Sequence, residues 1–96
     1  RQISDILPGD FILHQNYPNP FNGSTKIRFE IIKGGTVSIG IFDITGKKVV
    51  DLVNKQFTSG EYEVDYTTND NSSGVYFYSL SVDGIVLDTK KMIVLK

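Results

Sequence analysis

The chain contains no cysteine, a single histidine and no long apolar run. Without cysteine it has no disulfide framework and no cysteine nucleophile, although this absence does not assign a compartment. No stretch reaches the roughly 20 apolar residues that a membrane-spanning helix requires. Residues 1–4 form neither a methionine start nor a signal peptide, so we expect the sequence to be part of a longer protein.

An excess of charge of one sign is also missing. The chain has 10 Lys and Arg against 11 Asp and Glu, a formal net charge of -1, and no basic stripe that could neutralise phosphates. Nucleic-acid binding is therefore not expected. What the 96 residues do contain is 40% hydrophobic and 11% aromatic side chains, the composition of one folded domain with a single core.

The apolar residues recur with the period of two that is typical of β-strands. Residues 26–31, 36–42 and 61–66 each alternate, so that one face of each predicted strand is apolar. Turn signals follow at roughly 8–12-residue intervals, which gives about seven strands and no convincing helix. The residues predicted to lie in the core are Ile27, Phe29, Ile39, Ile41, Val64, Tyr76 and Leu80.

Glycine-containing dipeptides mark the predicted reversals of the chain. We expect hairpins at Gly34-Gly35, at Thr45-Gly46 and at Asp83-Gly84, the last with a type I′ turn. Val49 and Leu52 lie three positions apart, which indicates a β-bulge within residues 47–53 if both side chains point inward.

These patterns predict an all-β fold, an antiparallel immunoglobulin-like β-sandwich. Gly74 lies two residues before Tyr76 at the start of a long strand, as in the tyrosine corner of such sandwiches, and Tyr78 then stands where an antibody domain has cysteine. Residues 1–10 show too little periodicity for an element and are interpreted as the end of a linker from a preceding domain, with the folded domain at 11–96.

The most distinctive segment is residues 15–25, QNYPNPFNGST. Its two prolines fix φ and favour an extended backbone at the residues before them, so the segment should be stiff. On this support Tyr17 and Phe21 could each contribute roughly 1.5–3 kcal/mol if their rings are buried.

Catalytic or ligand-binding chemistry finds little support. His14 has no partner placed by spacing, and a surface or strand-end role is favoured over that of a general base. The acidic row of residues 61–65 is better explained as a solvated strand face than as a carboxylate pair. Residues 69–71, Asn-Asp-Asn, could offer oxygen ligands to a hard cation, but a plain turn is favoured. No metal or cofactor is expected.

Four segments together resemble the type A C-terminal sorting domain of cargo proteins of the bacterial type IX secretion system. They are residues 15–25, 42–49 (FDITGKKV), 73–80 (SGVYFYSL) and 90–96 (KKMIVLK), and the likeness extends over 11–96. One departure is that many relatives have a tryptophan and an Asp/Gly-rich turn where this chain reads YTTND at 66–70. The resemblance places recognition on Pro18, Asn19, Pro20, Phe21, Asn22, Asp43, Gly46, Gly74, Tyr76, Leu80, Lys90, Lys91, Met92, Val94 and Lys96.

The resemblance implies a role in recognition and no enzymatic activity. Such a domain follows a cargo domain and directs it across the outer membrane, by way of the type IX secretion machinery, to the cell surface or the medium. A sortase-like surface peptidase then removes the domain and joins the cargo to lipopolysaccharide. Whether a reading frame stops directly after Lys96 is a simple check of this hypothesis.

Alternatives stay open at this point. Tyr17 and Phe21 could plug one end of the sandwich or contact the secretion machinery, and the lysines of residues 90–96 could be edge-strand gatekeepers against aggregation or part of the address. The whole domain could also be an immunoglobulin-like binding or spacer module of an extracellular protein, since this fold serves many functions. A glycan-binding module would be expected to display exposed aromatic side chains.

Overall fold

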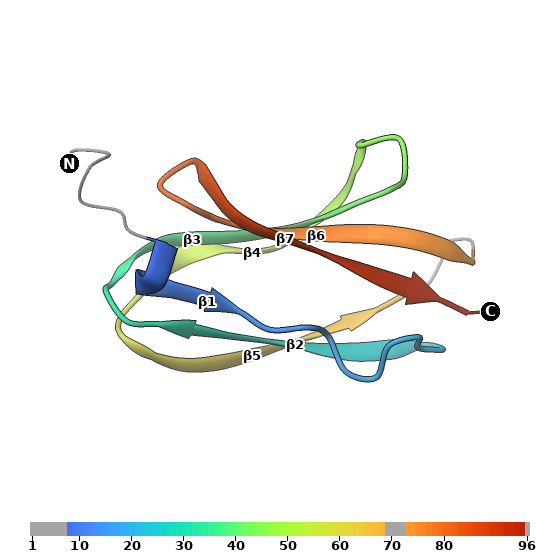
Figure 1. Ribbon diagram of the computed structural model, residues 1–96, viewed down its shortest axis with the longest axis horizontal. Helices are drawn as coiled ribbons and strands as arrows, with labels where there is room; N and C mark the ends of the chain where they lie inside the picture. The colour runs from blue at the N-terminus through green and yellow to red at the C-terminus, as the bar shows by residue number, and fades with distance from the viewer. Residues whose placement is uncertain (1–7, 69–72, 96) are drawn as a thin grey trace.

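Two antiparallel sheets pack face to face in the computed structural model, which describes residues 8–68 and 73–95 (Figure 1). One sheet has the order β1 (Phe11–Leu13), β2 (Ser24–Ile31) and β5 (Gly60–Thr67). The other has the order β4 (Lys48–Phe57), β3 (Gly35–Phe42), β6 (Gly74–Val82) and β7 (Ile85–Val94). The predicted antiparallel immunoglobulin-like sandwich, with seven strands in the described residues, is confirmed.

The core lies between the sheets and follows the alternation of the sequence. In β2, Ile27, Phe29 and Ile31 are at most 1% exposed, while the residues between them face solvent or the rim. Every predicted core residue except Val64 is buried. Val64 is only half-buried, because β5 is an edge strand and its inner face meets the open side of the sandwich.

One predicted hairpin is wrong. Gly34-Gly35 does not join neighbouring strands of a sheet, because β2 pairs with β1 and β5 whereas β3 pairs with β4 and β6. The glycines instead carry the chain from one layer to the other. A Cβ added at Gly35 would lie 3.1 Å from Val82 Cγ1, so this crossing passes close to the packed core.

The other two hairpins are confirmed. Gly46, in the β3–β4 connection, has φ of 90°. In the β6–β7 connection Asp83 and Gly84 have φ of 50° and 87°, and two positive φ angles are the signature of a type I′ turn.

The predicted bulge is also found, and it is double. The register of β3 against β4 runs from Ile39↔Val53 to Gly40↔Asp51 and from Ile41↔Val50 to Phe42↔Lys48. Leu52 and Val49 are therefore the extra residues. Leu52 packs against the core, whereas Val49 is 39% exposed, so only one of the two residues meets the condition on which the bulge was predicted.

The interpretation of residues 1–10 as linker needs a partial correction. Pro8–Asp10 form a 3₁₀ turn, η2, that leads directly into β1. The backbone N–H of Ile32 donates a 2.8 Å hydrogen bond to the carbonyl oxygen of Asp10, which ties this turn to the end of β2. This part of the segment therefore belongs to the folded domain, and residues 1–7 lie outside the described structure.

Candidate functional site

The proline-rich segment docks against the edge of the last strand. We call residues 17–22 the proline block. The N–H of Phe21 donates to the carbonyl oxygen of Ile93 at 3.0 Å, and the N–H of Leu95 donates to the carbonyl oxygen of Phe21 at 2.8 Å. Asn19 Oδ1 accepts a further bond, of 2.9 Å, from the N–H of Ile93. The first and the last of the four sequence motifs thus form one surface at the end of β7 (Figure 1).

The two aromatic rings of the block have different environments. Phe21 is 2% exposed and meets the ring of Tyr66 edge-on at a centroid distance of 6.3 Å. Tyr17 is 81% exposed, so the expectation that its ring could be buried is wrong. Backbone hydrogen bonds between Tyr17 and Lys26, 3.0 Å in both directions, hold it beside β2 with its side chain outward. The other members of the block are also exposed, namely Pro18, Asn19, Pro20 and Asn22.

Two buried polar residues support the block from below. Asn16 Nδ2 donates to the carbonyl oxygen of Pro18 at 3.1 Å and to Thr25 Oγ1 at 3.0 Å, and Thr25 Oγ1 donates to the same carbonyl at 2.8 Å. Both side chains are 2% exposed. Gln15 Nε2 adds a 2.7 Å bond to the carbonyl oxygen of Lys91. Sequence reasoning missed this network, although Thr25 shares the phase of the apolar face of β2 and could have signalled it.

The tyrosine that bonds back to the upstream backbone is Tyr78. Its hydroxyl donates to the carbonyl oxygen of His14 at 2.7 Å and accepts a 2.7 Å bond from the N–H of Asn16. The role that the tyrosine-corner pattern assigned to Tyr76 is thus filled two residues later. The side chain is fully buried, and this burial raises the pKa of Tyr78 to about 12.

The free energy of unfolding should fall as pH rises between 10.0, the usual tyrosine pKa, and about 12, that of Tyr78. In this interval the unfolded chain has lost the proton and the folded chain keeps it, so stability decreases by about 1.4 kcal/mol per pH unit. Below it the contribution is constant. Tyr78→Phe should be less stable near neutral pH, because the amide of Asn16 loses its acceptor, but should lack this slope. Urea denaturation of both proteins across this range checks the difference, and parallel pH profiles would contradict it.

The Asp43 and Gly46 motif forms a separate, self-contained turn. Asp43 Oδ1 accepts bonds from the N–H of Thr45 at 2.9 Å, the N–H of Lys47 at 3.0 Å and the Thr45 hydroxyl at 2.6 Å. The Thr45 hydroxyl bond lowers the pKa of this carboxyl group, with smaller contributions from the two backbone bonds. The turn lies in the β3–β4 hairpin, which projects away from the three-stranded sheet (Figure 1). The motif therefore stabilises a hairpin.

The third motif and the terminal motif pair on neighbouring strands. Gly74 lies opposite Val94, and Tyr76 lies opposite Met92. Tyr76, Leu80, Met92 and Val94 are all core residues. Lys91 is exposed, whereas Lys90 is half-buried with its Nζ 3.6 Å from Asp88 Oδ2. Lys96 lies outside the described residues.

The described residues offer little for catalysis. His14 Nε2 pairs with Glu30 Oε2 at a strand end. Within residues 8–68 and 73–95, no three His, Asp or Glu side chains converge as a metal site, and no helix has the length and apolar character needed to cross a bilayer. The possible cation loop at 69–71 lies outside the described residues.

No curated protein matches the chain. A solved structure of dimeric latent PorU from Porphyromonas gingivalis matches 88% of this chain with a TM-score of 0.70 and 22% identity, over 9% of that protein. Matches with TM-scores of 0.57 and 0.56 cover 88% and 91% of this chain. They are a Listeria innocua β-glucosidase in complex with isofagomine (10% identity, 16% of its length) and Pseudomonas fluorescens alkylpurine DNA glycosylase AlkC bound to DNA containing an abasic site analogue (14%, 31%).

At these identities the structural matches show the fold alone. The sequence profile of a family described as the secretion system C-terminal sorting domain matches residues 15–95, almost the whole described chain. This family is not catalytic, and it marks proteins that the type IX secretion system exports across the outer membrane to the cell surface or the medium. The alternative hypothesis, that the domain is a general binding or spacer module, is therefore not favoured. The chain belongs to the family of secretion system C-terminal sorting domains.

Proposed function

We propose that the surface read during export is the proline block together with the edge of β7, and that Tyr17 is its principal contact residue. The observation that carries this proposal is the docking of the block on β7 through the backbone of Phe21. Docking joins motifs that lie more than 70 positions apart in sequence into one patch. It also orders the block before any partner arrives, which reduces the entropy cost of recognition.

The different burial of the two rings supports a division of roles. Phe21 fills the end of the core and so anchors the block, whereas Tyr17 makes little use of its apolar surface within the domain. Exposed tyrosines offer a large, rigid contact area with a polar tip and are enriched in interfaces. Tyr17 also lines two hollows, of about 420 and 360 Å³. They are lined by residues that include Lys26, Arg28, Glu63 and Asp65.

In this proposal the partner is the type IX secretion machinery at the outer membrane. The domain performs no chemistry of its own and is covalently preceded by a cargo domain, from which a sortase-like surface peptidase removes it. The family assignment supports the machinery as partner. The exposed Lys91 and the half-buried Lys90 would extend the patch along β7 as its basic part.

Tyr17→Ala should reduce surface delivery of a reporter fused to the domain without unfolding it. Because the ring is exposed, its removal should change the free energy of unfolding by no more than about 0.5 kcal/mol. Ile44→Ala is the matched control, since Ile44 is 72% exposed in the distant β3–β4 turn. Delivery is measured by surface labelling of intact cells that carry the secretion system.

Two results would contradict the proposal. Normal delivery by a folded Tyr17→Ala domain would remove Tyr17 from the recognised surface. An equal loss with Ile44→Ala would show that delivery responds to exposed apolar area in general and not to the proline block.

A further inference from the structure

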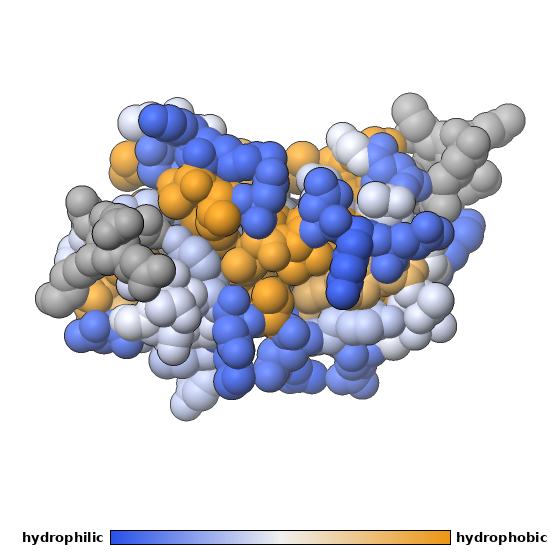
Figure 2. All heavy atoms as spheres, turned by 180° about the vertical axis from the view of Figure 1, so that it is seen from behind, coloured by the Kyte–Doolittle hydropathy of each residue, from blue (hydrophilic) through white to orange (hydrophobic). Residues whose placement is uncertain are grey.

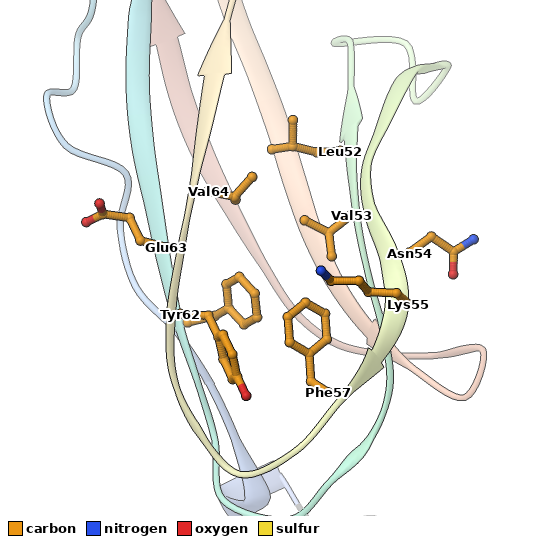
Figure 3. Close-up of a pocket in the computed structure, with 9 residues that line it drawn as sticks. Leu52, Val53, Asn54, Lys55, Phe57, Tyr62, Glu63 and Val64 are labelled. Atoms are coloured by element: carbon orange, nitrogen blue, oxygen red, sulfur yellow. The ribbon is translucent and has the colours of Figure 1, made fainter.

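The side of the sandwich opposite the proline block is open. There the edge strands β4 and β5 belong to different sheets, and within the described residues each pairs with one strand only. A groove of about 390 Å³ runs between them (Figure 3). Seen from behind, the molecule shows an apolar area hollowed between hydrophilic side chains (Figure 2).

The groove is apolar inside and charged at its rim. Its floor contains the rings of Phe29, Phe57 and Tyr62, whose centroids lie 4.7–5.6 Å from one another. The half-buried aliphatic side chains Leu52, Val53 and Val64 continue it. Lys55 lies across the opening, with Nζ 5.3 Å from the centre of the Phe57 ring (Figure 3).

The domain itself shows how an open side of this sandwich is closed. On the β7 side an extended segment bonds to the edge strand through its backbone and inserts one aromatic ring, that of Phe21, between the sheets. The β4 side offers the same two features, an edge strand and an apolar space between the layers. No described segment of the chain occupies it.

We propose that this groove binds an extended segment of a partner polypeptide that adds as a strand to β4 at Val53–Phe57. An added strand gains affinity from main-chain hydrogen bonds and specificity from alternate side chains. Between Val53 and Phe57 the register against β3 is regular, whereas the bulges at Val49 and Leu52 interrupt the rest of the edge. The site is therefore about five residues long.

Charge selects an acidic segment with one apolar anchor. On β4, Lys55 stands at the groove without an acidic neighbour among the ion pairs found in the described residues, whereas Lys48 is paired with Asp51 at 2.8 Å. On the β5 side Glu63 lies 3.5 Å from Lys26. Lys55 points to the inner face, because it pairs with the buried Val37. A carboxylate on the incoming strand would thus meet the ammonium group of Lys55, and an apolar side chain two positions away, on the same face of that strand, would enter the aromatic floor.

The test uses two blocked heptapeptides, Thr-Glu-Thr-Phe-Thr-Glu-Thr and the same sequence with lysine in place of glutamate, in which the charged residues and the phenylalanine share one face of an extended strand. Each is titrated into the ¹⁵N-labelled domain. We expect saturable shift changes at residues 53–57 and 62–64, with the acidic peptide binding about tenfold more tightly than the basic one. Lys55→Glu should abolish that preference. Val53→Glu should weaken both peptides, and Val86→Glu, at a residue 59% exposed on β7, is the control.

The outcomes separate the possible occupants. No shift change at millimolar peptide, or changes that persist in a folded Val53→Glu domain, would overturn the proposal. Saturable binding of dodecyl phosphate at the same residues, without peptide binding, would assign the groove to a lipid chain and also overturn it. A sedimentation coefficient that rises with protein concentration in the unmodified domain, but not in Val53→Glu, would show self-association. That result would assign the groove to a second copy of the domain instead.

Discussion

Replacing Phe29 with alanine should lower the free energy of unfolding by about 3–5 kcal/mol, the usual range for truncation of a buried phenylalanine. The ring is 1% exposed and contacts Phe57 and Tyr62 at centroid distances of 5.4 and 5.6 Å. Truncation would remove these ring contacts and leave unfilled space in the floor of the groove. Because stabilities of small domains are of the order of 5–15 kcal/mol, this single change should bring the domain close to unfolding.

Chemical denaturation of the unmodified domain and of Phe29→Ala measures this loss of stability. Phe57→Ala serves as a graded comparison, because Phe57 belongs to the same ring cluster in the floor of the groove but is only half-buried. The loss of unfolding free energy in Phe57→Ala should be clearly smaller than in Phe29→Ala. A loss below 1 kcal/mol for Phe29→Ala would show that the ring is not packed as described.

Phe21→Ala should release the proline block as well as destabilise the fold. The ring is 2% exposed, so its truncation should cost about 3 kcal/mol or more. Without this anchor the hydrogen bonds that the block makes to Ile93 and Leu95 should open. The amide hydrogens of these two residues should then exchange faster with solvent than the rest of β7 does.

Hydrogen exchange followed by NMR distinguishes this effect from global loss of stability. In Phe29→Ala all core amides should accelerate together, whereas in Phe21→Ala the amides of Ile93 and Leu95 should accelerate more than those of β3. Unchanged relative protection at Ile93 and Leu95 would mean that the backbone of the block holds its place without the ring.

The sequence predicted the layers well, because burial on one face of a strand leaves a direct alternation. Residues 26–31 illustrate this: their apolar positions are the buried positions of β2. Turn type was also predictable where glycine is required for positive φ, as at Gly84. The path of the chain between sheets was not, because Gly34-Gly35 satisfies equally a hairpin within one sheet and a crossing between two.

The candidate site was predictable in composition but not in arrangement. The proline block could be recognised as unusual, yet Tyr17 and Phe21 are both large and aromatic, and nothing local says which is buried. That outcome depends on the edge of β7, which lies far along the chain. The half-burial of Val64 is likewise set by the tertiary arrangement and not by the local sequence, since it reflects the gap between β4 and β5.

This domain acts as an export address, and we propose that it is read at the proline block and β7. The most direct test of this role fuses residues 1–96 to the C-terminus of a periplasmic reporter in a host with an active type IX secretion system. We expect that the reporter reaches the cell surface or the medium, and that it stays in the periplasm when the system is inactivated or the domain is omitted. A folded fusion that remains in the periplasm of the secretion-competent host would contradict it.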